Sequence, residues 1–495
     1  MFDRLRLCVP AGKAAGFRRA LTLLMGFCLV PMLAGCITAE RPELAVDIPP
    51  AYRAAPGAPA HAPPALDWWR GFGSSELTKL IEEAQTANFD IAAAVARIVQ
   101  ADAQSKVAGA PLLPVVNFNS SASRSRASQA GGSNVVSGSS SGSERSVYTT
   151  ALNASYEIDF WGKNRANSRV AQENAIASRF NRDVVALSTV ASVTTAYFQV
   201  LLSQDRLRVA RENLAAANRV LTLINQRFTA GTASRLDVAQ QESLVATQRA
   251  AIPPLDQSLR QNMAVLAVLV GRAPANLRVR GGSLYRLAIP RVTAGLPSEL
   301  LAQRPDIRAA EAALAAADAG VEAARAAMFP SITLTGQGGI TSTALRTLFT
   351  PEALFWQVAG NLAQPVFDGF RLEGLLEQAK GRQLELLETY RKAIISAFGD
   401  VEQALIAIAD GAERERLQRD VVMSSRRAFE IAETRLREGT VDLVIVLQTQ
   451  QTLFQAEDTL ALVRQARLQA VLSLYQALGG SWLPPPAEDI ANTTQ

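Results

Sequence analysis

The stretch "SVYTTALNASYEIDFWGKNR", residues 146–165, changes from one periodicity to another, and this change decides the fold. Between residues 146 and 160 the even positions are mostly apolar and the odd positions mostly polar, which over this length is typical of a membrane-spanning strand. From Lys163 to Ala230 neither Gly nor Pro occurs. A helix across that window would be about 100 Å long, far beyond an ordinary globular helix. The stretch therefore predicts a strand followed by a helix that belongs to a coiled coil or a helical barrel.

Three further segments have strand character. They lie at about 113–126, 330–342 and 353–366. Each has apolar residues at alternate positions, among them Phe118, Leu334 and Val358. A single strand of this kind would fit a soluble sheet equally well. Four strands, however, make an open sheet whose edges cannot be left bare in lipid, and a closed barrel needs about eight strands or more. A trimer with a barrel of about twelve strands is the smallest solution with an open lumen, and it places the even positions toward lipid and the odd ones toward water.

A second helical window runs from about residue 371 to 437. Its glycines are expected at close helix contacts, because each costs about 1 kcal/mol of helix propensity when exposed. They are Gly374, Gly381, Gly399 and Gly411. Heptads are imperfect in both windows, which favours helices packed on two neighbours over a two-stranded coil. Pro253 and Pro254 predict that a later helix is interrupted by a bend.

The chain also resembles itself at a spacing of about 208 residues. "QRFTAGTASRLDVAQ" at 226–240 aligns with "TRLREGTVDLVIVLQ" at 434–448, so that Arg227 matches Arg435 and Gly231 matches Gly439. Further matches occur in the same order along both halves, which makes chance similarity of Ala-rich helices a poor explanation. Each half reads helix, two strands, long helix, Gly-Thr turn and helix. The Gly-Thr turns should reverse the long helices at exposed ends.

The N-terminus has the pattern of a secretion signal. Five basic residues and one acid precede an apolar run from Leu21 to Leu33, which is too short for a retained membrane helix. "LAGC" then ends at Cys36 and resembles a bacterial lipoprotein cleavage site. An ordinary signal peptide followed by an unrelated cysteine is the alternative. We expect residues 1–35 to be the signal, residues 36–65 a lipidated Pro/Ala-rich tether, and residues 483–495 a disordered tail.

Composition excludes several function classes. The net charge of +5 falls to about +1 without residues 1–35, so nothing points to nucleic acid. His61 is the single histidine and lies in the tether, which removes the commonest general base and metal ligand. No phosphate-binding glycine loop is present. We therefore expect neither an enzyme nor a metal site.

The residues that carry the strongest resemblance are "LLAQRPDIRAAEAALAAADAGVEAARAAMFPSITLTG" from Leu300 and "YEIDFWGKNR" from Tyr156, with "LDWWRGFGSSEL" from Leu66 and "LYQALGGSW" from Leu474. They are similar to the outer membrane factor (TolC-like) family, in its lipoprotein branch of RND efflux channels. The resemblance implies an α+β membrane protein and a TolC-like homotrimer. Its twelve-stranded β-barrel, four strands per protomer, is continued by a long periplasmic α-helical barrel. It divides the mature chain into repeats at 66–274 and 298–482, joined by an equatorial segment at 275–297.

The same resemblance implies functional residues and partners. Gly231, Thr232, Gly439 and Thr440 would mark the periplasmic tips where a membrane fusion (adaptor) protein docks. Leu417 and Asp420 would form the aperture, although Asp420 would pair equally well with Arg416 or Arg419 on a solvated face. Cys36 would carry S-diacylglycerol and N-palmitoyl lipid in the outer membrane, and no other cofactor is expected.

The expected function is the outer membrane channel of a tripartite RND-type efflux system that exports drugs or other small toxic compounds from an inner-membrane RND transporter. Two alternatives remain from the sequence: the outer membrane channel of an ABC-driven type I protein secretion system, and a non-conducting coiled-coil structural lipoprotein. The second explains the helices and the lipid but not the alternating strands.

Overall fold

The computed structural model describes residues 46–54, 67–126, 144–292, 295 and 297–480. The expected signal peptide, Cys36, His61 and the C-terminal tail lie outside the described residues. The helices are α2 (Ser75–Ala87), α3 (Phe89–Gly109), α4 (Lys163–Thr229), α5 (Arg235–Leu269), α6 (Pro297–Gln303), α7 (Pro305–Ala326), α8 (Arg371–Glu438) and α9 (Leu443–Ala477). The strands are β1 (Val115–Arg126), β2 (Glu144–Ile158), β3 (Ser331–Ser342) and β4 (Leu354–Ala363).

The described chain forms two compact units, and these do not follow the two sequence repeats. Of the described residues, one unit takes 102–126, 144–174 and 314–387, and the other takes 46–54, 67–101, 175–292, 295, 297–313 and 388–480. Each unit therefore combines segments from both repeats. Mixed units of this kind are expected when corresponding elements of the two repeats pack against each other.

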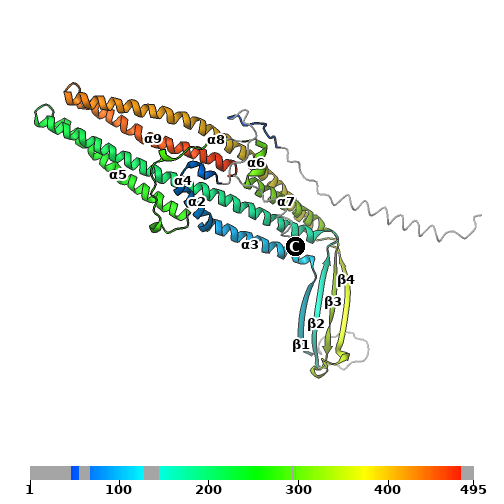
Figure 1. The fold of residues 1–495 in the computed structure, drawn as a ribbon. Coiled ribbons are helices and arrows are strands. Elements are labelled where there is room, and N and C mark those ends of the chain that lie inside the picture. The colour runs from blue at the N-terminus through cyan, green and yellow to red at the C-terminus, as the bar shows by residue number, and fades with distance from the viewer. Residues whose placement is uncertain (1–45, 55–66, 127–143, 293–294, 296, 481–495) are drawn as a thin grey trace, which may run out of the picture. The chain divides into compact units, whose positions relative to one another are not determined.

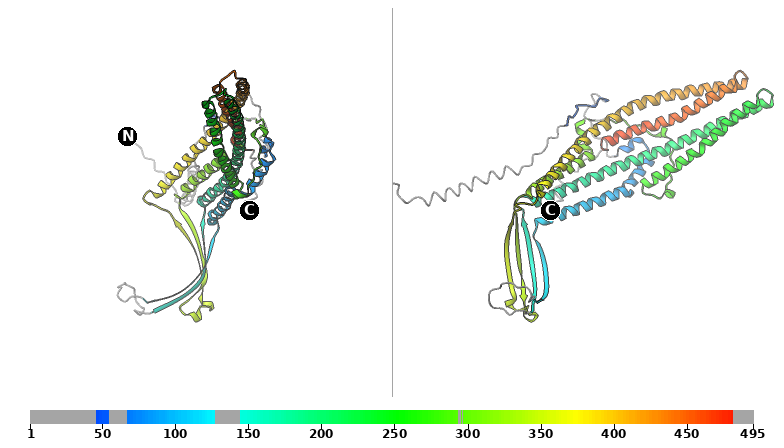
Figure 2. Two further views of the ribbon diagram at one scale, coloured as in Figure 1. Left: turned by 90° about the vertical axis from the view of Figure 1, so that its left-hand side faces the viewer. Right: turned by 180° about the vertical axis from the view of Figure 1, so that it is seen from behind.

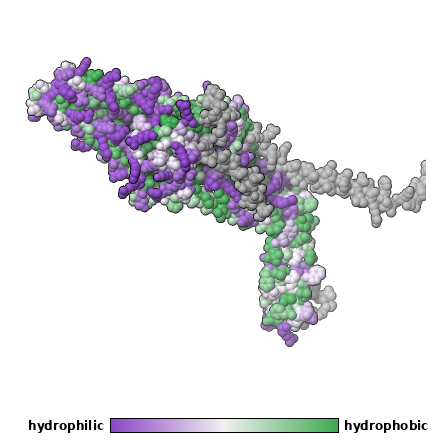
Figure 3. Space-filling model, viewed as in Figure 1, coloured by the Kyte–Doolittle hydropathy of each residue, from purple (hydrophilic) through white to green (hydrophobic). Residues whose placement is uncertain are grey.

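The first unit contains one antiparallel sheet in the order β1-β2-β3-β4 (Figure 1). Its register brings even positions together in rows across the strands, and one such row is Phe118, Leu152, Gly338 and Trp356. The neighbouring odd row is Asn117, Asn153, Gln337 and Gln357. Because alternate residues of a strand point to opposite faces, one face is apolar and the other polar. Apolar side chains over the strands are visible in Figure 3.

The two long helices are present as predicted. α4 has 67 residues and α8 has 68, and each is followed by a 35-residue helix, α5 or α9, to form a helical hairpin. Figure 2 shows the two hairpins side by side, with both turns at the same end. α4 is the one described helix that is long and apolar enough to cross a bilayer, but 56% of that apolar window is buried inside the protein. We interpret the window as a core helix.

The expected interruption at Pro253 and Pro254 was wrong, and the expected glycine contacts occur at one position within the protomer. α5 runs unbroken from Arg235 to Leu269 with Pro253 and Pro254 inside it, and its buried residues lie toward its two ends. Of the four glycines in α8, only Gly411 lies against another element: a β-carbon there would be 3.7 Å from Arg467 of α9. Gly374 and Gly381 face open space in the protomer, so the close helix contacts expected at these two glycines do not occur within one described chain.

The core of the second unit is rich in aromatic residues. Trp68 stacks on Tyr475 with ring centroids 4.7 Å apart, and Phe72 meets Phe198 edge to face at 5.3 Å. Side chains from α2, α4, α5 and α9 complete this cluster. The "WWRGF" segment at 68–72 thus packs on residues far away in the sequence, which explains its apolar composition.

Candidate functional site

The predicted turns lie where the two hairpins reverse. Gly231 and Gly439 have φ values of +74° and +77°, a conformation that favours glycine. The amide of Thr232 donates to the carbonyl of Arg227 at 2.8 Å, and the amide of Thr440 donates to Arg435 at 2.9 Å. Both threonine hydroxyls donate to the same carbonyls. The two turns are therefore the same structure, repeated 208 residues apart and exposed at their glycines.

The helices that leave the turns begin differently. Ser234 caps α5 in a reciprocal capping box: its hydroxyl accepts from the amide of Asp237 at 3.1 Å, and Asp237 accepts from the amide of Ser234 at 2.7 Å. Asp442 occupies the same place before α9 but makes no side-chain capping bond. A cap of this kind contributes about 1 kcal/mol, so the start of α9 is the less firmly held of the two.

Leu417 and Asp420 share one exposed face of α8. About half of each side chain is exposed in the protomer, and residues three apart lie on the same side of a helix. Asp420 accepts from Arg416 at 3.3 Å, and Arg416 also binds Glu413 at 2.7 Å. This hydrogen bond from Arg416 lowers the pKa of Glu413. Asp420 thus forms the ion pair with Arg416 that was the alternative to a role at the aperture. Its role at an aperture stays a prediction.

A buried charge cluster beside this face was not predicted. Glu415 is fully buried and binds three arginines: Arg419 on its own helix, and Arg464 and Arg467 of α9 at 3.3 and 2.8 Å. Arg464 also donates to the carbonyls of Leu284 at 3.3 Å and Leu287 at 2.8 Å. Burial lowers the pKa of Arg464, and the negative Glu415 opposes that shift. The cluster fixes α8 and α9 to the connecting segment that joins the two repeats.

The connecting segment carries an aromatic contact to the same arginine. The guanidinium of Arg464 lies over the Tyr285 ring, 5.8 Å from its centroid. Burial, with Asp205 and Glu415 acting in the same direction, raises the pKa of Tyr285 to about 12. Tyr285 is therefore neutral at physiological pH and serves as a platform for the cation.

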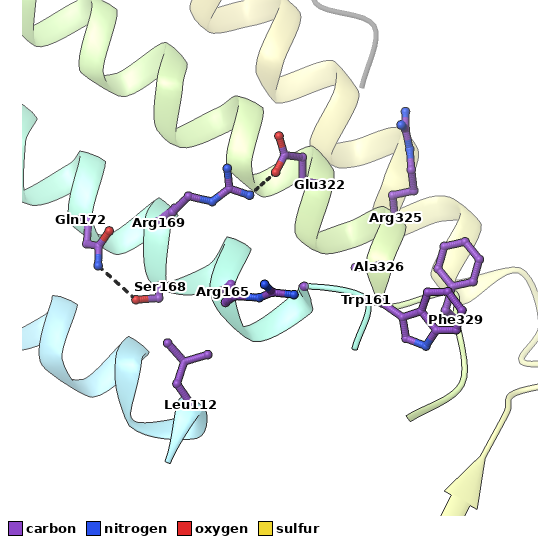
Figure 4. Close-up of a pocket in the computed structure, with 11 residues that line it drawn as sticks. Leu112, Trp161, Arg165, Ser168, Arg169, Gln172, Glu322, Arg325, Ala326 and Phe329 are labelled. Atoms are coloured by element: carbon purple, nitrogen blue, oxygen red, sulfur yellow. Dashed lines mark hydrogen bonds and ion pairs between the residues drawn. The ribbon is translucent and has the colours of Figure 1, made fainter. Parts of the chain in front are cut away.

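A cavity of about 500 Å³ lies in the first unit beside the start of α4 and the end of α7 (Figure 4). Trp161 stacks on Phe329 at 4.6 Å and donates from its indole nitrogen to the carbonyl of Pro330 at 2.9 Å. Arg169 pairs with Glu322, and Arg165 pairs with Asp159 at 3.1 Å. Two of its arginines are thus already paired with carboxylates, and Arg325 also has an interaction of its own. We assign this cavity a structural role at the junction of strand and helix.

The sheet has the two features that a pore wall needs. One face presents apolar side chains and the other presents amides and hydroxyls, as in the contact between the Thr149 and Thr341 hydroxyls at 3.0 Å. β1 and β4 each pair on one side only within the described residues. Free edges of this kind must be paired by other chains before the sheet can lie in lipid. Among the described residues no group of His, Cys, Asp or Glu is placed to hold a metal ion.

Comparisons with known proteins agree on one family. The family model described as "Outer membrane efflux protein" matches residues 80–272 and 296–480, which correspond to the two repeats. The pyoverdine export outer membrane protein OpmQ of Pseudomonas putida is 41% identical over 93% of this chain and 98% of its own length. The cation efflux system protein CusC of Escherichia coli is 30% identical over 93% of this chain and 98% of its own length.

Solved structures give the same result for the fold. The outer-membrane channel OprN superposes with a TM-score of 0.82 at 26% identity, and covers 91% of this chain and 100% of its own. The structure of CusC gives a TM-score of 0.79 at 27% identity, over 89% of this chain and 98% of its own.

Proposed function

The chain belongs to the outer membrane efflux protein family, whose solved members are trimeric TolC-like channels, and on that basis we propose that it is the outer membrane component of a tripartite pump. Its adaptor would be a periplasmic membrane fusion protein, and its energy source an inner-membrane RND transporter. The single observation that carries the proposal is the four-stranded sheet with one apolar face and two free edges, followed in each repeat by a helix of 67 or 68 residues.

The pore itself is tested by conductance. We expect the purified trimer to form channels in planar bilayers. A folded trimer that never conducts, with Asp420→Ala also silent, would instead support the structural lipoprotein.

The exported compounds are small molecules in this proposal. OpmQ is named for pyoverdine export and CusC for cation efflux, so pyoverdine, metal cations and drugs form the first panel to test. Deletion of the gene should reduce export of, or tolerance to, at least one of these compounds while leaving secreted proteins unchanged. Loss of a secreted protein alone would favour the type I secretion alternative.

Adaptor docking is proposed at the turns that contain Gly231, Thr232, Gly439 and Thr440. Gly231→Ala places a β-carbon in open space, so its effect comes from the positive φ alone, a cost of about 1 kcal/mol. We expect weaker adaptor binding in pull-down assays with Gly231→Ala. Gly374→Ala, in open space within α8, is the matched control and should bind normally.

We also propose that Cys36 is the lipidated first residue of the mature protein. Two or more acyl chains are needed for stable anchoring, since each buried methylene contributes about 0.8 kcal/mol. Mass spectrometry of the mature N-terminus tests this directly, and an unmodified cysteine would refute it.

A further inference from the structure

The connection between β3 and β4, residues 343–353, is ordered but exposes large apolar side chains. At its start, the hydroxyls of Ser342 and Thr347 are hydrogen-bonded at 2.6 Å. Phe349 and Leu345, by contrast, are 83% and 61% exposed. Local hydrogen bonds therefore fix a connection that keeps two large apolar side chains on its surface.

The exposed residues of the connection continue the apolar face of the sheet. Leu354 begins β4 and Trp356 follows on the same face, and these side chains are 70% and 78% exposed. Both occupy even positions, which we assign to the lipid side of the barrel. An apolar surface that passes from a lipid-facing strand into a loop favours contact of that loop with the same membrane.

The connection lies at the cell-surface end of the barrel. β2 leads into α4 and β4 leads into α8, so both long helices begin at the opposite end of the sheet (Figure 1). In the outer membrane channels of this family the long helices extend into the periplasm. The membrane lipid beside the connection is therefore that of the outer leaflet, where the glycolipid lipid A carries phosphates above its acyl chains.

Arginines accompany the apolar residues at this end of the sheet. Arg346 follows Leu345 in the connection, is exposed, and makes no hydrogen bond or ion pair within the described residues. Arg124 and Arg126 occupy even positions at the outer end of β1, where Arg124 donates to Glu144 at 3.0 Å. A guanidinium matches the oxygens of a phosphate in a bidentate contact. The charge and the apolar surface therefore both fit a phosphorylated lipid.

We infer that the β3–β4 connection binds lipid A of the outer leaflet. Phe349 and Leu345 lie among the acyl chains, and Arg346 binds a phosphate, with Arg126 supplying a second positive charge at the same end. The inference rests on the outer membrane barrel and is independent of the pump to which the channel connects. A connection held on lipid cannot fold over the mouth of the barrel, so it leaves the exit of the channel open.

Native mass spectrometry tests the role of the charge. The purified full-length trimer is titrated with lipid A in detergent. Arg346→Ala should weaken lipid A binding about fivefold, the factor for the roughly 1 kcal/mol that each arginine contributes at an anionic lipid surface. Arg145→Ala is the matched control, because it removes an exposed arginine from an odd position, on the water face of the same end, and it should bind like the wild type. Equal affinities of all three proteins would overturn the inference.

A second titration identifies the lipid. Phosphatidylglycerol has one phosphate and no sugar backbone, and it should bind the wild-type trimer at least fivefold more weakly than lipid A. Equal binding of the two lipids would show that the glycolipid is not the specific partner. If Arg346→Ala dissociates the trimer without changing lipid A binding, the arginine belongs to a contact between protomers and the inference is wrong.

Fluorescence quenching tests the position of the apolar side chains. An environment-sensitive fluorophore is attached to Phe349→Cys, in a Cys36→Ser background, and the trimer is reconstituted into vesicles of phosphatidylethanolamine and lipid A. Spin-labelled lipid should quench this probe, whereas aqueous iodide should not. Glu352→Cys is the control, because this exposed carboxylate should face water and its probe should respond to iodide. If iodide quenches both probes equally, Phe349 does not enter the membrane and the inference fails.

Discussion

At the residue scale, Glu415 is the centre of a buried charge cluster in the second unit. A buried carboxylate faces three guanidinium groups, and one of these, Arg464, also satisfies two carbonyls of the connecting segment. Removing the carboxylate leaves Arg464 buried without compensation, which is far more costly than losing a surface pair. Nothing in the local sequence around Glu415 distinguishes it from its exposed neighbour Glu413.

We predict that Glu415→Ala destabilises the protein by about 3–5 kcal/mol, because Arg464 remains buried without its carboxylate. The measurement is the thermal unfolding of the trimer in detergent, followed by circular dichroism. Glu413→Ala removes an exposed carboxylate two residues away, and its transition should match the wild type. Equal transitions for both variants would show that the cluster is not structural.

A second residue-scale prediction concerns Asp420. If its exposed face of α8 lines the aperture, three carboxylates in a ring should attract cations. Asp420→Asn should then reduce the preference for cations, measured as the reversal potential in a potassium chloride gradient across a planar bilayer. Unchanged selectivity would mean that Asp420 serves only its ion pair with Arg416.

At the element scale, the alternating pattern of each strand gives the sheet one apolar face and one polar face. The register aligns even positions of four strands on one face and odd positions on the other, so a single rule of alternation separates lipid from water. The repeat acts at this scale too, since each half supplies two strands and one hairpin. Neither half alone has enough strands to approach closure.

The two faces make a sharp mutational contrast on adjacent residues of β4. Val358→Arg puts a charge on the lipid face, which costs about 2–4 kcal/mol at the centre of the membrane, and should reduce the amount of inserted trimer. Gln357→Arg puts the same charge on the water face and should insert normally but shift selectivity toward anions. Outer membrane fractionation and bilayer recordings measure the two effects, and the reverse pattern would invert our assignment of faces.

At the scale of the whole molecule, two features hold the protein in the outer membrane: the barrel and the lipid expected on Cys36. A closed barrel buries a continuous apolar band, whereas acyl chains contribute only a local anchor. The barrel should therefore be sufficient for retention once assembly is complete.

We predict that Cys36→Ser lowers processing and the amount of mature protein more than it changes the activity of each pore. Immunoblots give the amount, and bilayer recordings on equal quantities of trimer give the activity. A mutant trimer that inserts correctly but does not conduct would contradict this view.

Periodicity and helix breakers within single segments were enough to predict the strands, their two faces, the long helices and the Gly-Thr turns. The sequence did not reveal that α5 continues through Pro253 and Pro254. Tertiary structure alone decided that Glu415 meets Arg464, 49 positions away, and that Arg227 reaches Leu436, 209 positions away. The physical reason is that backbone geometry repeats along a segment and leaves its period in the sequence. A contact between distant segments depends on how whole elements pack, and it leaves no local signal.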